Sequence, residues 1–289
     1  MRILPLLLIL LVAGGATSSP AAGPSGQITL WSDRDGDPDV FTMNVDGTNA
    51  RNLGRPGWGD KRASWSPDGT KIGYDSWDVG HRDFDIWIMR ADGSDKTQLT
   101  TSPLRDTLPA WSPDGRWIAF TRKRARSTAE DVWLIRPDGT GEHRLVTGAS
   151  GAAWSPDGKR LVFSRYSDAW LSDVNGRNLR RLTRMRGFES PAAGGWSPDG
   201  RTILFTHWPI GGFGDVFVTS PRGKSVRRLT SAKADDTDAS WSPDGRQIVF
   251  DSTRDGNREV YLMNRNGSGQ RNISHNPAED WADTWRPQG

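Results

Sequence analysis

The feature that most constrains this chain is a pentapeptide that recurs along almost its whole length. The sequence W-S-P-D-G occurs five times, and a degenerate copy, W-R-P-Q-G, ends the series. The motifs begin at Trp65, Trp111, Trp154, Trp196, Trp241 and Trp285, with spacings of 46, 43, 42, 45 and 44 residues. A fixed period in this range is the signature of a repeat architecture in which each repeat is one supersecondary unit.

Each repeat predicts four short antiparallel strands. Ser-Pro-Asp-Gly suits a tight turn, because Pro presets the backbone and Gly accepts a positive φ. The next segment alternates apolar residues, as in Ile72 and Tyr74, and a later Asp-Gly or Asn-Gly pair marks a second hairpin. Four strands per 42–46 residues is the period of a β-propeller blade, so the sequence predicts an all-β, six-bladed propeller.

The two ends of the repeat series predict how the ring closes. The first recognisable segment, 27–32, corresponds to the second strand of a blade, whereas the last, 282–287, corresponds to a first strand. We therefore expect the C-terminal strand to join the N-terminal blade. Such closure removes an open sheet edge that would otherwise pair with other chains.

The N-terminus is typical of a secretory signal peptide. Arg2 precedes an apolar run at 3–13, and small residues follow to Ala22. We predict a signal peptide at 1–22, a propeller domain at 23–289 and a secreted or periplasmic location. The apolar run is short for a membrane span, so no stable span is expected after cleavage, and an uncleaved anchor is the alternative.

The repeat resembles that of the TolB family, a WD-repeat-like type. The resemblance rests on W-S-P-D-G, on Asp85-Ile-Trp-Ile-Met-Arg-Ala-Asp-Gly93 and on the closing Leu99-Thr100, and it covers residues 26–289. It implies a periplasmic propeller that serves as a docking platform for a protein partner. TolB proteins carry a separate α/β domain before the propeller, and we expect none here because the signal segment runs almost directly into the first blade.

Composition and motif content exclude several function classes. Thirty-eight basic and 35 acidic residues give a net charge of +3, which is not the footprint of a nucleic-acid binder. There is no Cys, and G-x-S-x-G, the nucleophile motif of α/β-hydrolases, is absent. The four His residues form no close-spaced metal pair, and we expect His81 and His207 to lie in loops. We therefore predict a non-catalytic monomer without a metal or cofactor.

The predicted partner-binding site lies on one face of the ring. The two tight hairpins of each blade share one side, so the variable loops and the connections between blades share the other, where recognition is usually built. Four blades place an Asp five residues before the motif Trp, near the mouth of the central channel. The candidate residues are Asp60, Asp106, Asp236, Asp280, Trp58, Trp77, Arg82, Arg105, Arg165, Arg186, Trp208 and Trp281.

These candidates allow more than one interpretation. The Asp residues form either an acidic funnel for a positively charged partner or structural caps on backbone N–H groups of the connecting loops. Exposed aromatic and Arg side chains are typical of protein interfaces, which favours an envelope or extracellular protein partner. Aromatic platforms also stack on sugars, so a glycan-binding or lyase-like propeller that uses the same face is the alternative.

Overall fold

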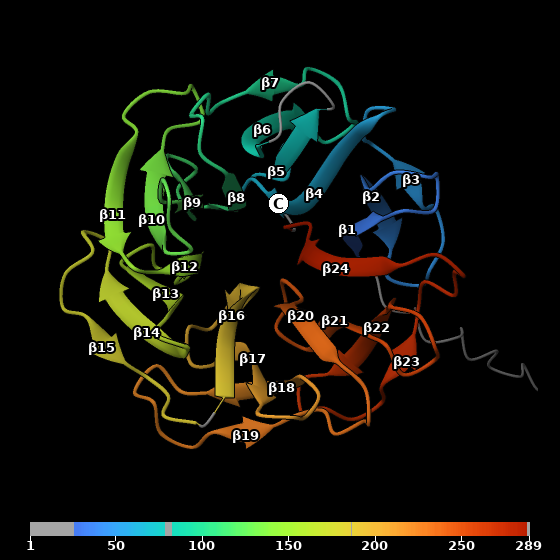
Figure 1. Cartoon of the computed structure of the whole chain (residues 1–289). Helices are drawn as coiled ribbons and strands as arrows, with labels where there is room; N and C mark the ends of the chain where they lie inside the picture. The colour runs from blue at the N-terminus through green and yellow to red at the C-terminus, as the bar shows by residue number, and fades with distance from the viewer. Residues whose placement is uncertain (1–25, 79–82, 186, 288–289) are drawn as a thin grey trace, which may run out of the picture.

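The fold is a closed ring of six blades around a central axis (Figure 1). The computed structural model describes residues 26–78, 83–185 and 187–287. In this part of the chain every regular element is a β-strand, and no helix is available that could cross a membrane. Each blade has four strands that pair antiparallel, and a parallel pair, Gly194 with Ser240, also joins two neighbouring blades. This arrangement confirms the predicted six-bladed all-β propeller (Figure 1).

In each blade the strands follow one another in order from the channel to the outer edge. Blade 1 combines β24 (Asp280–Trp285) with β1 (Gln27–Ser32), β2 (Asp39–Asn44) and β3 (Arg51–Asn52). Blade 2 comprises β4 (Trp58–Trp65), β5 (Lys71–Asp78), β6 (Asp85–Arg90) and β7 (Thr97–Gln98). Blade 3 comprises β8 (Asp106–Trp111), β9 (Ile118–Lys123), β10 (Glu130–Ile135) and β11 (His143–Thr147).

The remaining three blades follow the same order. Blade 4 comprises β12 (Ser150–Trp154), β13 (Arg160–Arg165), β14 (Asp168–Asp173) and β15 (Arg180–Arg181). Blade 5 comprises β16 (Gly187–Trp196), β17 (Ile203–Pro209), β18 (Asp215–Thr219) and β19 (Arg227–Arg228). Blade 6 comprises β20 (Asp236–Trp241), β21 (Gln247–Ser252), β22 (Glu259–Asn264) and β23 (Arg271–Asn272).

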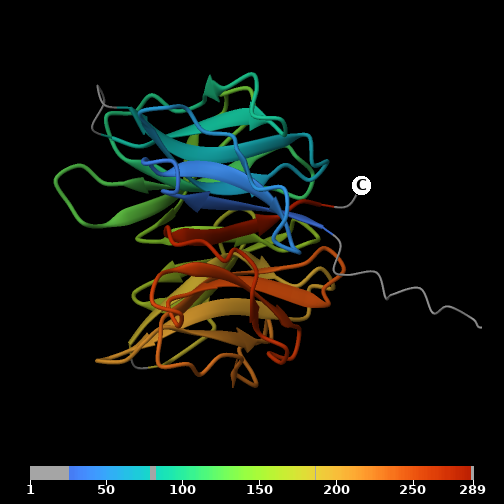
Figure 2. The same cartoon turned by 90° about the vertical axis from the view of Figure 1, so that its right-hand side faces the viewer.

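The ring closes as predicted, through the two ends of the propeller. Strand β24 pairs antiparallel with β1, and Leu30 lies opposite Ala282. Both views show the two strands side by side (Figures 1 and 2). The Thr29 hydroxyl also donates to the Thr284 carbonyl at 3.2 Å. Strand β1 is therefore paired on both sides, with β24 and β2, and the N-terminal segment leaves no open edge for another chain.

The Ser-Pro-Asp-Gly segments form the tight turns that their sequence predicts. In the first copy, the Ser66 hydroxyl donates to Asp68 at 2.6 Å and accepts from the Lys71 amide at 2.9 Å. Gly69 follows with a φ of 65° and donates its amide to the Ser66 carbonyl. The same Ser–Asp hydrogen bond recurs in the other four copies, so one local sequence sets the same hairpin in five blades.

The motif Trp residues pack between blades. Trp285 belongs to a buried cluster that joins Ile28 and Met43 of blade 1 to Val249 and Leu262 of blade 6. Its indole N–H donates to the Ser240 carbonyl of blade 6 at 3.1 Å, and Trp154 makes the equivalent bond to Ala110 of blade 3. A large flat ring thus fills the wedge between two blades, and at Trp154 and Trp285 its N–H also ties the wedge to the neighbouring inner strand.

Candidate functional site

The face with the variable loops carries most of the exposed apolar surface. Seven large apolar side chains are exposed among the described residues, and five of them lie at variable-loop ends of blades 2, 4 and 5: Trp77, Tyr166, Phe188, Ile210 and Phe213. The other two, Leu179 and Val226, lie in tight hairpins on the opposite face. The two faces therefore differ in the residue types that dominate protein interfaces.

The four predicted channel-mouth carboxylates are all fully buried. Each lies opposite a residue on the second strand of its own blade, in the same register: Asp60 with Ser76, Asp106 with Arg122, Asp236 with Ser252 and Asp280 with Ser32. Three of them also bind a guanidinium through both oxygens, from Arg122, Arg254 and Arg34, at 2.6–2.9 Å. The hydroxyl of Ser76 donates to Asp60.

The backbone of these four residues connects neighbouring blades. The amide of each Asp donates to a carbonyl just before the third strand of the preceding blade: Pro38, Phe84, Gly214 and Arg258, at 2.7–2.8 Å. The carboxylates mainly bind side chains within a blade, whereas backbone capping was the structural interpretation expected from sequence. Burial and these hydrogen bonds give the four residues a positioning role at the rim, although the Oδ2 atom of Asp60 has no hydrogen-bond partner among the described residues.

The other predicted rim residues are distributed over four blades. Trp58 is partly buried, with the Arg55 guanidinium 3.7 Å from its ring centroid. The Arg105 guanidinium lies over the half-buried ring of Phe84, 4.9 Å from its centroid, and that of Arg165 lies over Tyr166 at the same distance. The ring of Trp208 lies beside that of Phe188. Arg82 and Arg186 lie outside the described residues.

His207 is not a loop residue, which corrects the expectation from sequence. It lies within β17, is buried, and faces the Phe217 ring edge-on at 5.8 Å. Strand β17 extends to Pro209 because its partner β16 is long. His81 falls outside the described residues.

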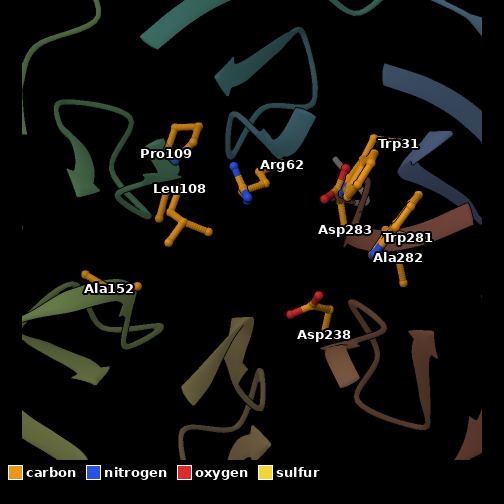
Figure 3. A pocket seen from close by; sticks show the side chains of 11 residues that line it. Trp31, Arg62, Leu108, Pro109, Ala152, Asp238, Trp281, Ala282 and Asp283 are labelled. Carbon is orange, nitrogen blue, oxygen red and sulfur yellow. The ribbon is translucent and has the colours of Figure 1, made fainter. Parts of the chain in front are cut away.

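A pocket of about 190 Å³ lies in the central channel, between the inner strands (Figure 3). Every inner strand has a register shift shortly before its motif Trp. At three of these bulges a non-glycine residue has a left-handed backbone: Arg62, Leu108 and Asp238, with φ of 51°, 57° and 47°. A bulge redirects its side chain, and here all three side chains line the pocket.

Two buried ion pairs flank this pocket. The Arg62 guanidinium donates to Asp75 at 2.8 Å, and Arg258 pairs with Asp251. Both carboxyl groups are completely buried. Burial and the nearby Asp238 raise the pKa of Asp251 to about 7, although Arg258 opposes that shift. The two cations are thus already engaged by partners of their own.

Two carboxyl groups of the pocket lack such a cation. Asp238 is exposed and Asp283 is buried, both line the pocket, and neither forms an ion pair with a described residue. Asp283 is only 6% exposed, and its Oδ2 atom has no hydrogen-bond partner in the described part of the chain. Burial, together with repulsion from Asp238 and Asp75, raises the pKa of Asp283 well above its usual range.

Stacked tryptophans form one wall of the pocket. The rings of Trp31 and Trp281 lie 3.6 Å apart and almost parallel. Lys61 lies over Trp31 at 4.4 Å, and Arg258 lies over Trp281 at 5.8 Å. Trp281, which was predicted as a rim residue, therefore belongs to the channel pocket (Figure 3).

Sequence reasoning missed this pocket, although one signal was present. The position two residues before the motif Trp holds a small or apolar residue in five blades: Ala63, Pro109, Ala152, Gly194 and Ala239. The sixth blade has Asp283 there. A carboxylate at a position that the repeat otherwise keeps uncharged is the deviation that a blade-by-blade alignment would have identified.

We expect Asp283→Asn to stabilise the protein, and increasingly so as the pH rises. The raised native pKa of Asp283 means that the wild-type fold binds a proton which the unfolded chain releases above about pH 4. Wild-type stability from this group is therefore present at low pH and is lost as the native carboxyl ionises. Urea unfolding at pH 4.5 and pH 8 should show a gain on the order of 1 kcal/mol at pH 8 and little at pH 4.5.

The control for that experiment is Asp95→Asn, which removes the same charge from an exposed turn. Asp95 has a φ of 53°, a conformation that Asn accepts readily. Equal effects of the two substitutions, or a gain from Asp283→Asn that shrinks as the pH rises, would contradict an uncompensated carboxylate in the channel.

Comparison with known proteins identifies the repeat. Residues 79–209 and 153–289 match the family model of the TolB β-propeller domain, and together they cover well over half of the chain. No curated protein matches the sequence.

Solved structures share the fold at low sequence identity. TolB from Acinetobacter baumannii aligns with a TM-score of 0.79 and 23% identity, over 91% of this chain and 67% of its own. A propeller assigned as TolB from Agrobacterium tumefaciens aligns with a TM-score of 0.69 and 20% identity, over 92% and 100% of the two chains. An oligogalacturonate lyase from Vibrio parahaemolyticus gives 0.58 and 12%, over 86% and 74%. At such identities these alignments establish the architecture.

Proposed function

The chain belongs to the TolB β-propeller domain family, and from that premise we propose that it is a secreted or periplasmic, non-catalytic scaffold. In this proposal residues 1–22 direct export, and the propeller of residues 23–289 works as a monomer. It docks an envelope or extracellular protein on the variable-loop face around the channel. Propellers of this family are binding scaffolds in general, and the finer assignment is ours.

The observation that carries the proposal is the unequal distribution of exposed apolar side chains. Blade 5 contributes three of them, Phe188, Ile210 and Phe213, which we call the blade-5 patch. Ile210 is 87% exposed, so it buries almost none of its surface within this chain. Apolar groups that cluster at loop ends of one face, with Arg side chains nearby, favour association with another protein.

The predicted site residues take different parts in this proposal. The docking face includes the side chains of Trp58, Trp77, Arg105, Arg165 and Trp208. Arg82 and Arg186, which lie outside the described residues, stay candidates for partner binding from the sequence alone. The buried residues Asp60, Asp106, Asp236 and Asp280 hold the inner strands in register and thereby position the loops that carry the face. Replacement of these Asp residues would test folding more than docking, so the sharper test uses the exposed patch.

We expect the triple variant Phe188→Ser, Ile210→Ser, Phe213→Ser to lose partner binding at least tenfold while its fold is unchanged. Hot-spot residues of this kind contribute about 2 kcal/mol or more each, whereas exposed apolar residues contribute little to folding. The measurement is a crosslinked pull-down from the native envelope fraction, followed by titration of the captured protein. Circular dichroism confirms the fold.

The matched control is Leu179→Ser with Val226→Ser, which removes the exposed apolar residues of the opposite face. A protein captured equally by the wild type, the patch variant and the control would disprove docking through the blade-5 patch. If no protein is captured by any of them, binding to a glycan array on the same face becomes the alternative to measure.

A further inference from the structure

The channel pocket is distinct from the docking face, and its charges are unbalanced. Arg62 and Arg258 each pair with a buried carboxylate outside the pocket lining, Asp75 and Asp251. Within the lining, Asp238 and Asp283 lie near enough to repel each other. Figure 3 shows Arg62, Asp238 and Asp283 projecting from three different inner strands toward the same space. A positive charge placed there would satisfy two carboxylates at once.

We propose that this pocket binds an organic cation, an alkylammonium or alkylguanidinium group, between Asp238 and Asp283. The buried Oδ2 atom of Asp283, which has no partner among the described residues, is the acceptor that such a group would reach. Two carboxylates that approach one space from different blades suit a group with several N–H donors.

The lining explains why the cation would be organic. Leu108, Pro109 and Ala152 contribute aliphatic surface on the side opposite the tryptophan pair (Figure 3). An alkyl chain gains free energy by leaving water for such a surface. In the described part of the chain no three His, Asp or Glu residues are arranged to hold a metal ion.

The aromatic wall supports the same assignment in a different way. The faces of Trp31 and Trp281 cover each other, and Lys61 and Arg258 lie over their outer faces. The pair is therefore a rigid apolar wall and not an open cation–π cage. Selectivity for a positive charge therefore comes from the carboxylates of Asp238 and Asp283. Replacing either carboxylate with a neutral amide should remove that selectivity.

The sequence of the repeats agrees that Asp283 is not required by the fold. The other five blades have a small or apolar residue at the equivalent position, and they form the same four antiparallel strands as blade 1. A buried carboxylate without a cation is costly to a protein unless something neutralises it. A proton can neutralise Asp283 at low pH, and a bound cation would neutralise it in place of that proton.

The test uses n-butylammonium as the probe, with n-butanol as its neutral counterpart, on the mature protein by isothermal titration calorimetry at pH 8. We expect n-butylammonium to bind and n-butanol to bind at least tenfold more weakly. Asp283→Asn and Asp238→Asn should each weaken n-butylammonium at least tenfold, and Asp95→Asn should leave it unchanged. Thermal melting confirms that each variant is folded, which Asp283→Asn is expected to be.

Proton release gives a second readout. Asp283 faces Asp238 from β20, Asp75 from β5 and Arg62 from β4, and its raised pKa falls when a cation binds. Binding should therefore strengthen as the pH rises from 5 to 8. Titrations in buffers of different ionisation enthalpy should show proton release in the wild type that Asp283→Asn reduces.

The cation could be a free amine or a basic side chain of a docked protein, and a short peptide distinguishes the two. Acetyl-Gly-Lys-Gly-amide that binds more tightly than n-butylammonium assigns the pocket to a protein side chain, and the reverse order assigns it to a free amine. Binding of neither probe, or equal binding by the wild type and Asp283→Asn, would overturn the proposal. This site can fail while the blade-5 patch is confirmed, because the two experiments share no variant.

Discussion

Trp285→Ala is expected to lower the free energy of unfolding by about 3–5 kcal/mol, the usual cost of replacing a buried Trp with Ala. The ring of Trp285 is almost fully buried in the cluster that joins blade 6 to blade 1. Its N–H bond to Ser240 crosses the same boundary. The substitution therefore creates a cavity and removes a donor at the place where the ring closes.

The measurement is urea or thermal unfolding followed by circular dichroism, with size-exclusion chromatography to detect association. A matched control is Trp77→Ala, because Trp77 is 37% exposed and lies at a loop end. We expect the control to cost much less. If the two variants unfold alike, Trp285 is not what holds the ring closed.

A disulfide across the closing strands is expected to raise stability by about 2–4 kcal/mol, the typical gain from a crosslink. The variant is Thr29→Cys with Thr284→Cys. The two hydroxyl oxygens lie 3.3 Å apart although the residues are 255 positions apart in the sequence. A bond there closes almost the entire propeller, so it removes more conformational freedom from the unfolded chain than a bond within a blade would.

The wild-type chain contains no Cys, so the reduced and oxidised forms of one sample provide the comparison. The oxidised form should melt at the higher temperature, and reduction should remove the gain. Thr29→Cys alone controls for loss of the hydroxyl bond. Identical melting of the oxidised and reduced forms would contradict the expected gain, because the crosslink would then not constrain the unfolded chain more than the folded one.

The architecture could be predicted from sequence because its determinants are local and repeated. A Ser-Pro-Asp-Gly turn needs only residues 66–69 to set its hairpin, and Ser66 and Asp68 hydrogen-bond within it. Alternation of apolar residues, as at Ile72 and Tyr74, sets which strand face is buried. Five copies of this information and a sixth, degenerate one define the number of blades, and the two ends of the series define how the ring closes.

The channel-mouth residues show which property could not be predicted from the sequence. The position of Asp106 near the variable-loop end of its strand was predictable from the period. Its burial was not, because that depends on Arg122 across the sheet and on the Phe84 carbonyl of the preceding blade. A residue that looks available in a linear sequence became part of the connection between two blades.

The sequence by itself determined the all-β class, six blades, the turn chemistry and the closing strand, since each depends on neighbours within one repeat or on the order of repeats. Only the tertiary structure decided what lies in the channel. Arg62, Asp238 and Asp283 come from three blades and are up to 221 residues apart in the sequence. Curvature of the ring and the bulges of the inner strands bring them together, and no local pattern encodes the distance between blades across a channel.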